Sequence, residues 1–228
     1  AHLAYVQGLI SAKRHYNLDK SDEHHKRGLA YINRISSSES SRIERSWLMN
    51  GLALNHALKW RRNPKNNDKD FTSAYRLVSE AFKLVSNLDD APAAYLRFNL
   101  IANMSFLIEM KGDCSAAAIS LEKAFEVSSK LESNLNSDIA YRIGVLKHHL
   151  AGVRLCLSAR AKNGALHHFV MMQRIKSNSS ETETILNELM GSGLAESVLE
   201  EYQVSPPPSK LPAYIPEIDL ENLPAIDL

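Results

Sequence analysis

The sequence predicts an all-α protein of stacked helical hairpins with an extended proline-rich C-terminal tail, and two observations support this. Hydrophobic residues make up 44% of the chain and charged residues 23%, while only nine glycines leave few turns for an all-β fold. Alanines seven residues apart recur 43 residues further along the chain, and small residues at this spacing let two helices approach closely. The small residues related by the 43-residue offset are Gly8 and Gly51, Ala74 and Ala117, and Ala81 and Ala124.

Two helices are predicted in the first hairpin. Apolar residues recur at helical spacing in residues 2–16 and again in residues 21–35. Asn17-Leu18-Asp19 supplies the turn, and Ser21 is suited to cap the second helix. The apolar positions are Leu3, Val6, Leu9 and Ile10 in the first helix, and Leu29, Ile32 and Ile35 in the second.

The second hairpin is predicted between a serine cluster and an acidic turn. Ser36 to Ser41 can cap a helix that ends near Arg62, and Asn63 to Asn67 has the composition of a loop. Asp70 then begins a helix that continues to Val85. The residues that give these two helices their apolar faces are Trp47, Leu48, Leu52, Leu54, Leu58, Phe71, Leu77, Val78, Phe82 and Val85.

The third hairpin has the clearest start and turn signals. Asp89-Asp90-Ala91-Pro92 suits the first turn of a helix that continues to Met110, because acids and an early proline favour helix starts. Gly112-Asp113 turns the chain, and residues 115–131 form the partner helix. Further helices are predicted at residues 137–161, around residues 166–172, and at residues 181–202.

The C-terminal tail differs from the rest of the chain, so we divide the chain into a helical repeat domain, residues 1–204, and a tail, residues 205–228. Pro206-Pro207-Pro208 excludes helix, yet the tail is too apolar for a purely solvated segment. Ile218-Asp219-Leu220 is repeated as Ile226-Asp227-Leu228. The residues of this candidate ligand motif are Ile218, Asp219, Leu220, Leu223, Ile226, Asp227 and Leu228.

Charge makes the tail a candidate internal ligand. From Glu196 onward the chain has seven acids and only Lys210 as a base, so this part carries −6 and the remainder +7 of the net +1. Opposite charges attract the two parts. We therefore predict that residues 211–228 dock on a repeat groove, in this chain or in a neighbouring copy, where tail exchange would give a homo-oligomer. The alternative is a mobile tail that binds another protein.

The spacing of small residues resembles the tetratricopeptide repeat family. Trp47 and Gly51 fit positions where that family favours tryptophan and a small residue. The match covers residues 45–130, and the 43-residue spacing, longer than the family's usual period of about 34, points to its long-helix variants. HEAT-like repeats, with periods of about 40–47, are an alternative. The other residues that carry the resemblance are Ala74, Val78, Ala81, Ser105, Gly112, Asp113, Ala117, Leu121 and Ala124.

The resemblance implies a protein-interaction scaffold whose first helices line a concave groove. Asn99 and Asn103 lie one turn apart, where they could hydrogen-bond the backbone of an extended peptide, although solvent or neighbouring backbone would also satisfy them. The candidate peptide-binding residues are Arg45, Leu48, Leu52, Asn55, His56, Asn99, Asn103 and Phe106.

Other site types have less support. Three adjacent histidine pairs lack the spacing of three or four that metal pairs favour on helices, so we expect one histidine inward and one outward in each pair, and no metal or cofactor. Five basic residues surround Trp60, but the net charge of +1 makes nucleic acid an unlikely partner. The histidine pairs are His24-His25, His148-His149 and His167-His168, and the basic residues are Lys59, Arg61, Arg62, Lys65 and Lys69.

Our interpretation is a cytoplasmic adaptor or regulatory domain that binds a protein or peptide. No apolar run approaches the ~20 residues that span a bilayer, so no membrane partner is expected. The alternative is a helical accessory subunit or effector domain of a larger assembly that acts through its convex face. No catalytic motif is present, so no catalytic residue is predicted and an enzyme ranks third.

Overall fold

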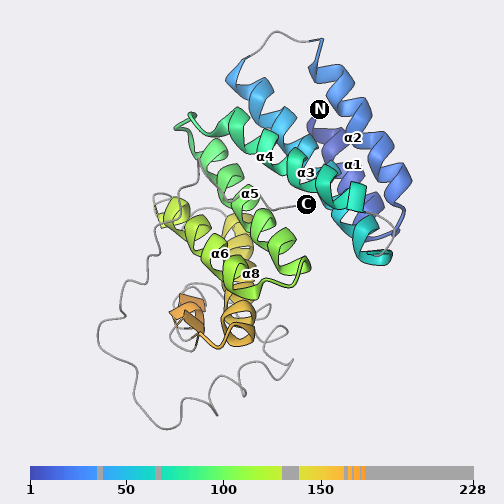
Figure 1. The fold of residues 1–228 in the computed structure, drawn as a ribbon. Coiled ribbons are helices and arrows are strands. Elements are labelled where there is room, and N and C mark those ends of the chain that lie inside the picture. Colours follow the sequence, from blue (N-terminus) through green and yellow to red (C-terminus); the bar gives the residue numbers. More distant parts are fainter. Residues whose placement is uncertain are drawn as a thin grey trace. The chain divides into compact units, whose positions relative to one another are not determined.

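The computed structural model describes residues 1–34, 38–64, 68–129 and 139–161, and residues 164, 165, 167–169, 171 and 172 of the following stretch. Every regular element in these ranges is a helix, which confirms the all-α prediction (Figure 1). The chain forms two compact units, an N-terminal unit (Ala1–Lys111) and a C-terminal unit (Gly112–Pro224). The helix predicted at residues 181–202 and the tail from residue 205 lie outside the described residues.

The N-terminal unit contains five helices in two hairpins and a fifth helix. Helix α1 packs on α2 and α3 packs on α4, while α2 also contacts α3 and α4 also contacts α5. In addition α1 contacts α3, and α3 contacts α5, so α3 touches the other four helices. The bounds are His2–Lys13 (α1), Leu18–Ile32 (α2), Glu39–Arg62 (α3), Asp68–Val85 (α4) and Ala91–Met110 (α5).

Side-chain caps explain where α3 and α5 begin. Ser38 and Ser41 form a capping box, in which each side chain bonds the backbone N–H of the other at 2.9–3.1 Å. Asp90 caps α5 by accepting from the Ala93 N–H at 2.8 Å. Both starts agree with the serine and acidic signals in the sequence.

The cap of α2 differs from the prediction. Asn17, not Ser21, caps the helix, because its Oδ1 accepts from the Lys20 N–H at 3.0 Å. Ser21 is fully buried, and its hydroxyl donates to the carbonyl oxygen of Gly8 in α1 at 2.8 Å. The residue expected to start the helix therefore joins two helices instead.

The alanine row of α4 lies in the core, as the spacing predicted. Ala74 and Ala81 are fully buried with Val78 between them. Because these side chains are small, the Ser46 hydroxyl of α3 reaches the backbone carbonyl of Ala81 at 3.0 Å. The small residues thus bring α3 and α4 close enough for a side chain of one to bond the backbone of the other.

Two glycines leave a slot for a histidine ring between α1 and α3. His25 of α2 is fully buried, and a Cβ at Gly8 or at Gly51 would stand 2.5 Å from its Nε2. Real Cβ atoms do not approach a neighbour this closely, so the ring occupies the space that a side chain at either glycine would need. The 43-residue spacing of the two glycines therefore marks where both α1 and α3 contact the same ring.

The C-terminal unit repeats this packing device. Helix α6 (Cys114–Ser129) packs on α8 (Ile139–Ser158), and a further helical stretch contains His168. His168 is fully buried, and a Cβ at Gly152 of α8 would stand 2.7 Å from its Cε1. The row predicted for α6 is also buried; it consists of Ala117, Leu121 and Ala124.

Replacing Gly51 with alanine tests the slot. Alanine normally stabilises a helix relative to glycine, but here we expect Gly51→Ala to destabilise the chain by about 1–3 kcal/mol, because the methyl group overlaps the His25 ring. Urea unfolding followed by circular dichroism measures the change. The same substitution in a His25→Ala background should cost less, since the ring is absent. Equal costs in the two backgrounds would contradict the slot.

Candidate functional site

The groove positions predicted on α3 divide between core and surface. Leu48, Leu52 and Asn55 are buried, whereas Arg45 and His56 are half-buried. Leu48 contributes to packing, since a Cβ at Gly28 of α2 would stand 3.1 Å from its Cδ1. A ligand on the surface of α3 therefore meets Arg45 and His56 before it meets the other three.

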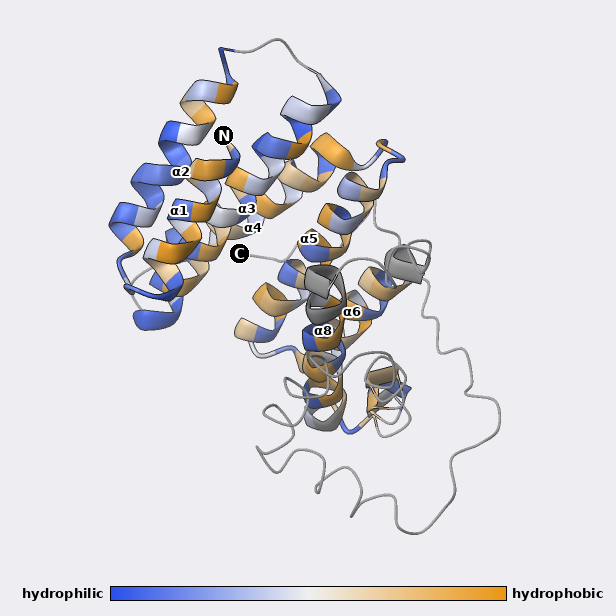
Figure 2. Cartoon of the chain, turned by 180° about the vertical axis from the view of Figure 1, so that it is seen from behind, coloured by the Kyte–Doolittle hydropathy of each residue, from blue (hydrophilic) through white to orange (hydrophobic). Residues whose placement is uncertain are grey.

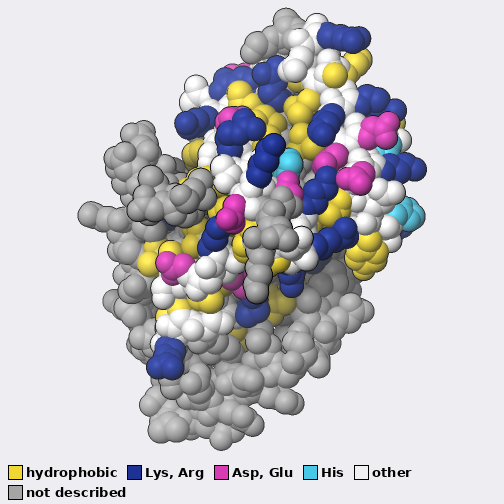
Figure 3. All heavy atoms as spheres, turned by 45° about the vertical axis from the view of Figure 1, so that its right-hand side comes forward, with side chains coloured by type: hydrophobic (Ala, Val, Ile, Leu, Met, Phe, Trp, Pro, Cys, Tyr) yellow, Lys and Arg dark blue, Asp and Glu magenta, His cyan; other side chains and the backbone are white. Residues whose placement is uncertain are grey.

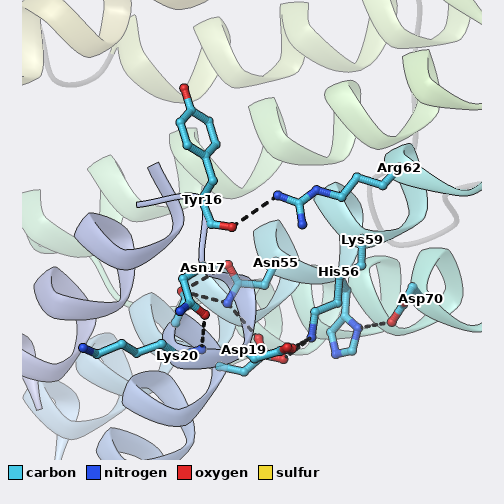
Figure 4. Close-up of polar contacts among 11 residues, drawn as sticks. Tyr16, Asn17, Asp19, Lys20, Asn55, His56, Lys59, Arg62 and Asp70 are labelled. Atoms are coloured by element: carbon cyan, nitrogen blue, oxygen red, sulfur yellow. Dashed lines mark hydrogen bonds and ion pairs between the residues drawn. The ribbon is translucent and has the colours of Figure 1, made fainter. Parts of the chain in front are cut away.

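Asn55 is the centre of a buried polar network between α2 and α3 (Figure 4). Its Nδ2 donates to the Ser21 hydroxyl at 2.8 Å and to Asp22 Oδ1 at 2.7 Å. Ser21 in turn donates to the Gly8 carbonyl oxygen, so the network connects three helices. Because buried polar groups must find partners, these bonds fix the register of α1, α2 and α3.

Lys59 extends the network toward solvent. Its Nζ lies 2.7 Å from Asp22 Oδ2 and 3.1 Å from Asp19 Oδ1. Partial burial alone would lower the pKa of Lys59, but hydrogen bonds and charges from Asp22 and Asp19 outweigh this and raise it. One residue of the predicted basic cluster is therefore neutralised within the N-terminal unit.

The rest of the basic cluster is more open, while its tryptophan is packed. Arg61 and Lys69 are exposed, and Arg62 Nη2 donates to the Tyr16 carbonyl oxygen at 3.4 Å. The Trp60 ring packs on Phe71 with centroids 5.4 Å apart, under the Lys111 ammonium. The indole of Trp60 is therefore held by packing between α3 and α4. Lys65 lies outside the described residues.

A histidine–carboxylate pair joins α3 to the first turn of α4. His56 Nδ1 lies 2.5 Å from Asp70 Oδ1, and both side chains are largely shielded from solvent. A carboxylate in this position fixes the orientation of the imidazole ring. His56, assigned to the groove from the sequence, is thus held by α4 at the side of α3.

The two asparagines of α5 make different bonds. Asn99 Nδ2 donates to the Tyr95 carbonyl oxygen of its own helix at 2.9 Å, while Asn103 Nδ2 donates to Asn50 Oδ1 of α3 at 2.7 Å. Both are half-buried, as is Phe106. Asn103 therefore helps to hold α5 on α3, and peptide binding by the eight candidate residues remains a prediction.

In each histidine pair the second residue is buried and the first is half-buried. His149 Nδ1 lies 3.1 Å from His168 Nδ1, and His168 Nε2 lies 3.0 Å from Glu122 Oε1 without the angle of a hydrogen bond. Burial first, then neighbouring histidines, lowers the pKa of His149 well below its usual range. Among the described residues no group of three ligand-type side chains could hold a metal ion.

Cys156 lies on the same helix as His149, two turns further along. Burial, and then the charge of Glu122, raises the pKa of its thiol to about 11. A thiol with so high a pKa is mainly protonated at neutral pH and is a weak nucleophile. Cys156 and Cys114 are free thiols in the structure.

His25 carries an unusual buried imidazole. Neither ring nitrogen has a hydrogen-bond partner among the described residues. Burial lowers the pKa of His25 to about 4, although Asp22 opposes the shift and His24 adds to it. The slot therefore accepts the neutral ring and excludes the charged one.

The sequence analysis did not predict the hydrogen-bond network around Asn55, although residue spacing in α3 indicated it. Gly51, Asn55 and Lys59 are spaced four residues apart and so share one face of α3. Gly51 already marked that face as a close contact. A polar residue one turn after such a glycine is better interpreted as a buried hydrogen-bonding group than as a groove residue.

Comparisons with known proteins do not assign the chain to a family. No family model matches the sequence, and neither a curated protein nor a solved structure matches it. The helices of the described ranges include none that is long and apolar enough to cross a membrane. The tetratricopeptide-like interpretation therefore depends on the residues and on the helix contacts described above.

The His25 slot predicts a specific pH dependence. The unfolded chain binds a proton near the ordinary pKa of 6.5, whereas the folded chain resists protonation down to about 4. Stability is therefore complete above pH 6.5 and is lost as the pH falls toward 4, by up to about 1.4 kcal/mol per pH unit. Urea unfolding at pH 7.5 and 5.0, read by Trp47 fluorescence in a Trp60→Phe background, measures this loss.

The matched control removes the titrating group. His25→Gln in the same background should reduce the difference in the free energy of unfolding between the two pH values, because the titrating imidazole is removed. The part of the difference that comes from the histidines of the C-terminal unit should remain. If the difference in the free energy of unfolding is unchanged, His25 does not contribute to the pH dependence of stability.

Proposed function

We propose that this chain is a tetratricopeptide-like repeat scaffold that binds a peptide or protein segment in the cytoplasm. The observation that carries the proposal is the pattern of helix–helix contacts in the N-terminal unit. The first helices α1, α3 and α5 contact one another in series, and each second helix packs on the first helix of the next pair. Consecutive hairpins that stack in this way form a continuous surface of first helices, the arrangement that repeat proteins use for binding.

The side chains on that surface suit an extended ligand. Arg45 supplies a positive charge on α3, and Asn99 supplies an amide on α5. An amide can both donate to and accept from a peptide backbone, while an arginine binds carboxylates. The chain also has an acidic tail, and exchange of tails between copies is one route to a homo-oligomer.

A second function is favoured by a separate observation. The large exposed apolar side chains of the described residues all lie in the first hairpin, whereas the candidate groove positions lie on α3 and α5. Such a surface is typical of a subunit that docks on another protein. The chain could therefore serve as an accessory subunit of a larger assembly, through a face other than the groove.

Selection of peptides from a random displayed library tests the groove. We expect selected peptides to bind the full chain at micromolar Kd, and the pair Arg45→Ala and Asn99→Ala to weaken them tenfold or more, because both side chains would contact the ligand. Fluorescence anisotropy measures the change. Lys83→Ala, an exposed substitution on α4, is the control and should leave binding unchanged. Failure to select any peptide, or equal effects of both variants, would contradict groove binding.

A further inference from the structure

Helix α1 has apolar residues on two opposite faces. Its inner face contains the buried Gly8 and Ala12, which pack against α2 and α3. Its outer face contains Leu3, Val6 and Ile10, which are 69%, 36% and 41% exposed. Positions three and four apart share a helix face, so these three side chains form one stripe. Figure 2 shows hydrophobic residues among those of α1.

An apolar helix of this kind is normally covered on all sides. Helix α5 has the same all-round apolar character, and ten of its 20 residues are buried. In α1 only three of 12 residues are buried. Together with Tyr16 and Tyr31, the outer stripe accounts for all the large hydrophobic side chains classed as exposed in the described residues. We therefore interpret the outer face of α1 as a docking surface.

The first hairpin, which contains this apolar face, has an excess of basic side chains. Residues 1–34 contain six Lys or Arg and three Asp or Glu, a formal charge of +3. Two of the three acids, Asp19 and Asp22, are engaged by Lys59. Figure 3 shows Lys and Arg side chains interspersed with hydrophobic ones over the helices of the N-terminal unit, with fewer acids. The six basic residues are all exposed; they are Lys13, Arg14, Lys20, Lys26, Arg27 and Arg34.

We propose that residues 211–228 of this chain dock on the outer face of α1. This inference goes beyond the proposed groove, because it assigns a ligand to a different face of the N-terminal unit. The segment contains four acids and no Lys or Arg, so its charge of −4 is opposite in sign to the +3 of residues 1–34. Prolines oppose helix formation and favour an extended backbone, so we take the bound segment to be extended.

The repeated tripeptide matches the stripe in spacing. In an extended chain, residues two apart point to the same side and lie about 6.6 Å apart. In an extended bound segment, Ile218 and Leu220 would present two apolar side chains on one side and Asp219 would point to the other. Along α1, Val6 and Ile10 are separated by about 6 Å of helix rise. Each Ile-Asp-Leu unit can thus place two apolar side chains over about one turn of the stripe.

Binding of a labelled peptide to the full chain tests this docking. The chain's own tail is first prevented from competing with the peptide by four substitutions: Ile218→Ser, Leu220→Ser, Ile226→Ser and Leu228→Ser. A fluorescein-labelled peptide of residues 211–228 is then titrated, and fluorescence anisotropy gives Kd. We expect a micromolar Kd that weakens tenfold or more with Val6→Ser plus Ile10→Ser, and with a peptide whose four acids are replaced by amides.

Controls separate this inference from the groove. Both stripe residues are partly exposed, so the double variant should fold, which circular dichroism verifies. Arg45→Ala plus Asn99→Ala should leave tail binding unchanged. Absence of tail binding, or undiminished binding to the stripe variant, would overturn the inference. Loss of tail binding in the Arg45 and Asn99 variant alone would also overturn it, while supporting the groove function.

A different occupant of the stripe would be recognised by a different experimental result. If the unmodified full chain is a dimer that dissociates with Val6→Ser plus Ile10→Ser but not with the four tail substitutions, a second copy of α1 covers the stripe. That outcome, measured by analytical ultracentrifugation, would also overturn the inference. Peptides selected from the display library would bind independently of it.

Discussion

The close approach of α1, α2 and α3 around the His25 ring is the constraint on which the N-terminal unit depends. Gly8 and Gly51 come from different hairpins, yet both lack the side chain that would occupy the position of the ring. Tyr5 packs beside it, with ring centroids 5.8 Å apart, and Trp47 packs on Tyr5. One imidazole therefore sets how closely the first hairpin can stack on the second.

Hydrogen bonds next to the slot turn close approach into a defined register. Ser21 lies one turn before His25 on α2 and bonds the Gly8 carbonyl oxygen, while Asn55 lies one turn after Gly51 on α3 and bonds Ser21. An apolar contact tolerates sliding, but a buried hydrogen bond that loses its partner costs about 1–3 kcal/mol. The slot and the network together therefore leave one arrangement of the three helices. In this arrangement the side chains of the outer stripe of α1 are exposed. The positions predicted to line a groove lie on α3 and α5.

The sequence predicted the helices and their small residues better than it predicted what each face contacts. Ala74, Ala81, Ala117 and Ala124 are buried, because small residues in a periodic row have few uses other than close packing. Asn55 was assigned to the groove because the family resemblance implied that position, and a resemblance does not say whether solvent or a neighbouring helix contacts a given side chain. The stripe of Leu3, Val6 and Ile10 has ordinary helical spacing, and only the packed structure distinguishes it from a core face. The partner of the two glycines was also hidden, since it comes from a third helix.

Proton NMR measures the central contact directly. If one ring holds α1 and α3 together, the His25 Hε1 proton should show nuclear Overhauser effects to α protons of both Gly8 and Gly51 at pH 7.5. Those α protons should also be shifted upfield by the ring current. Effects to only one of the glycines, or to neither, would contradict the account that the two hairpins stack on a shared imidazole.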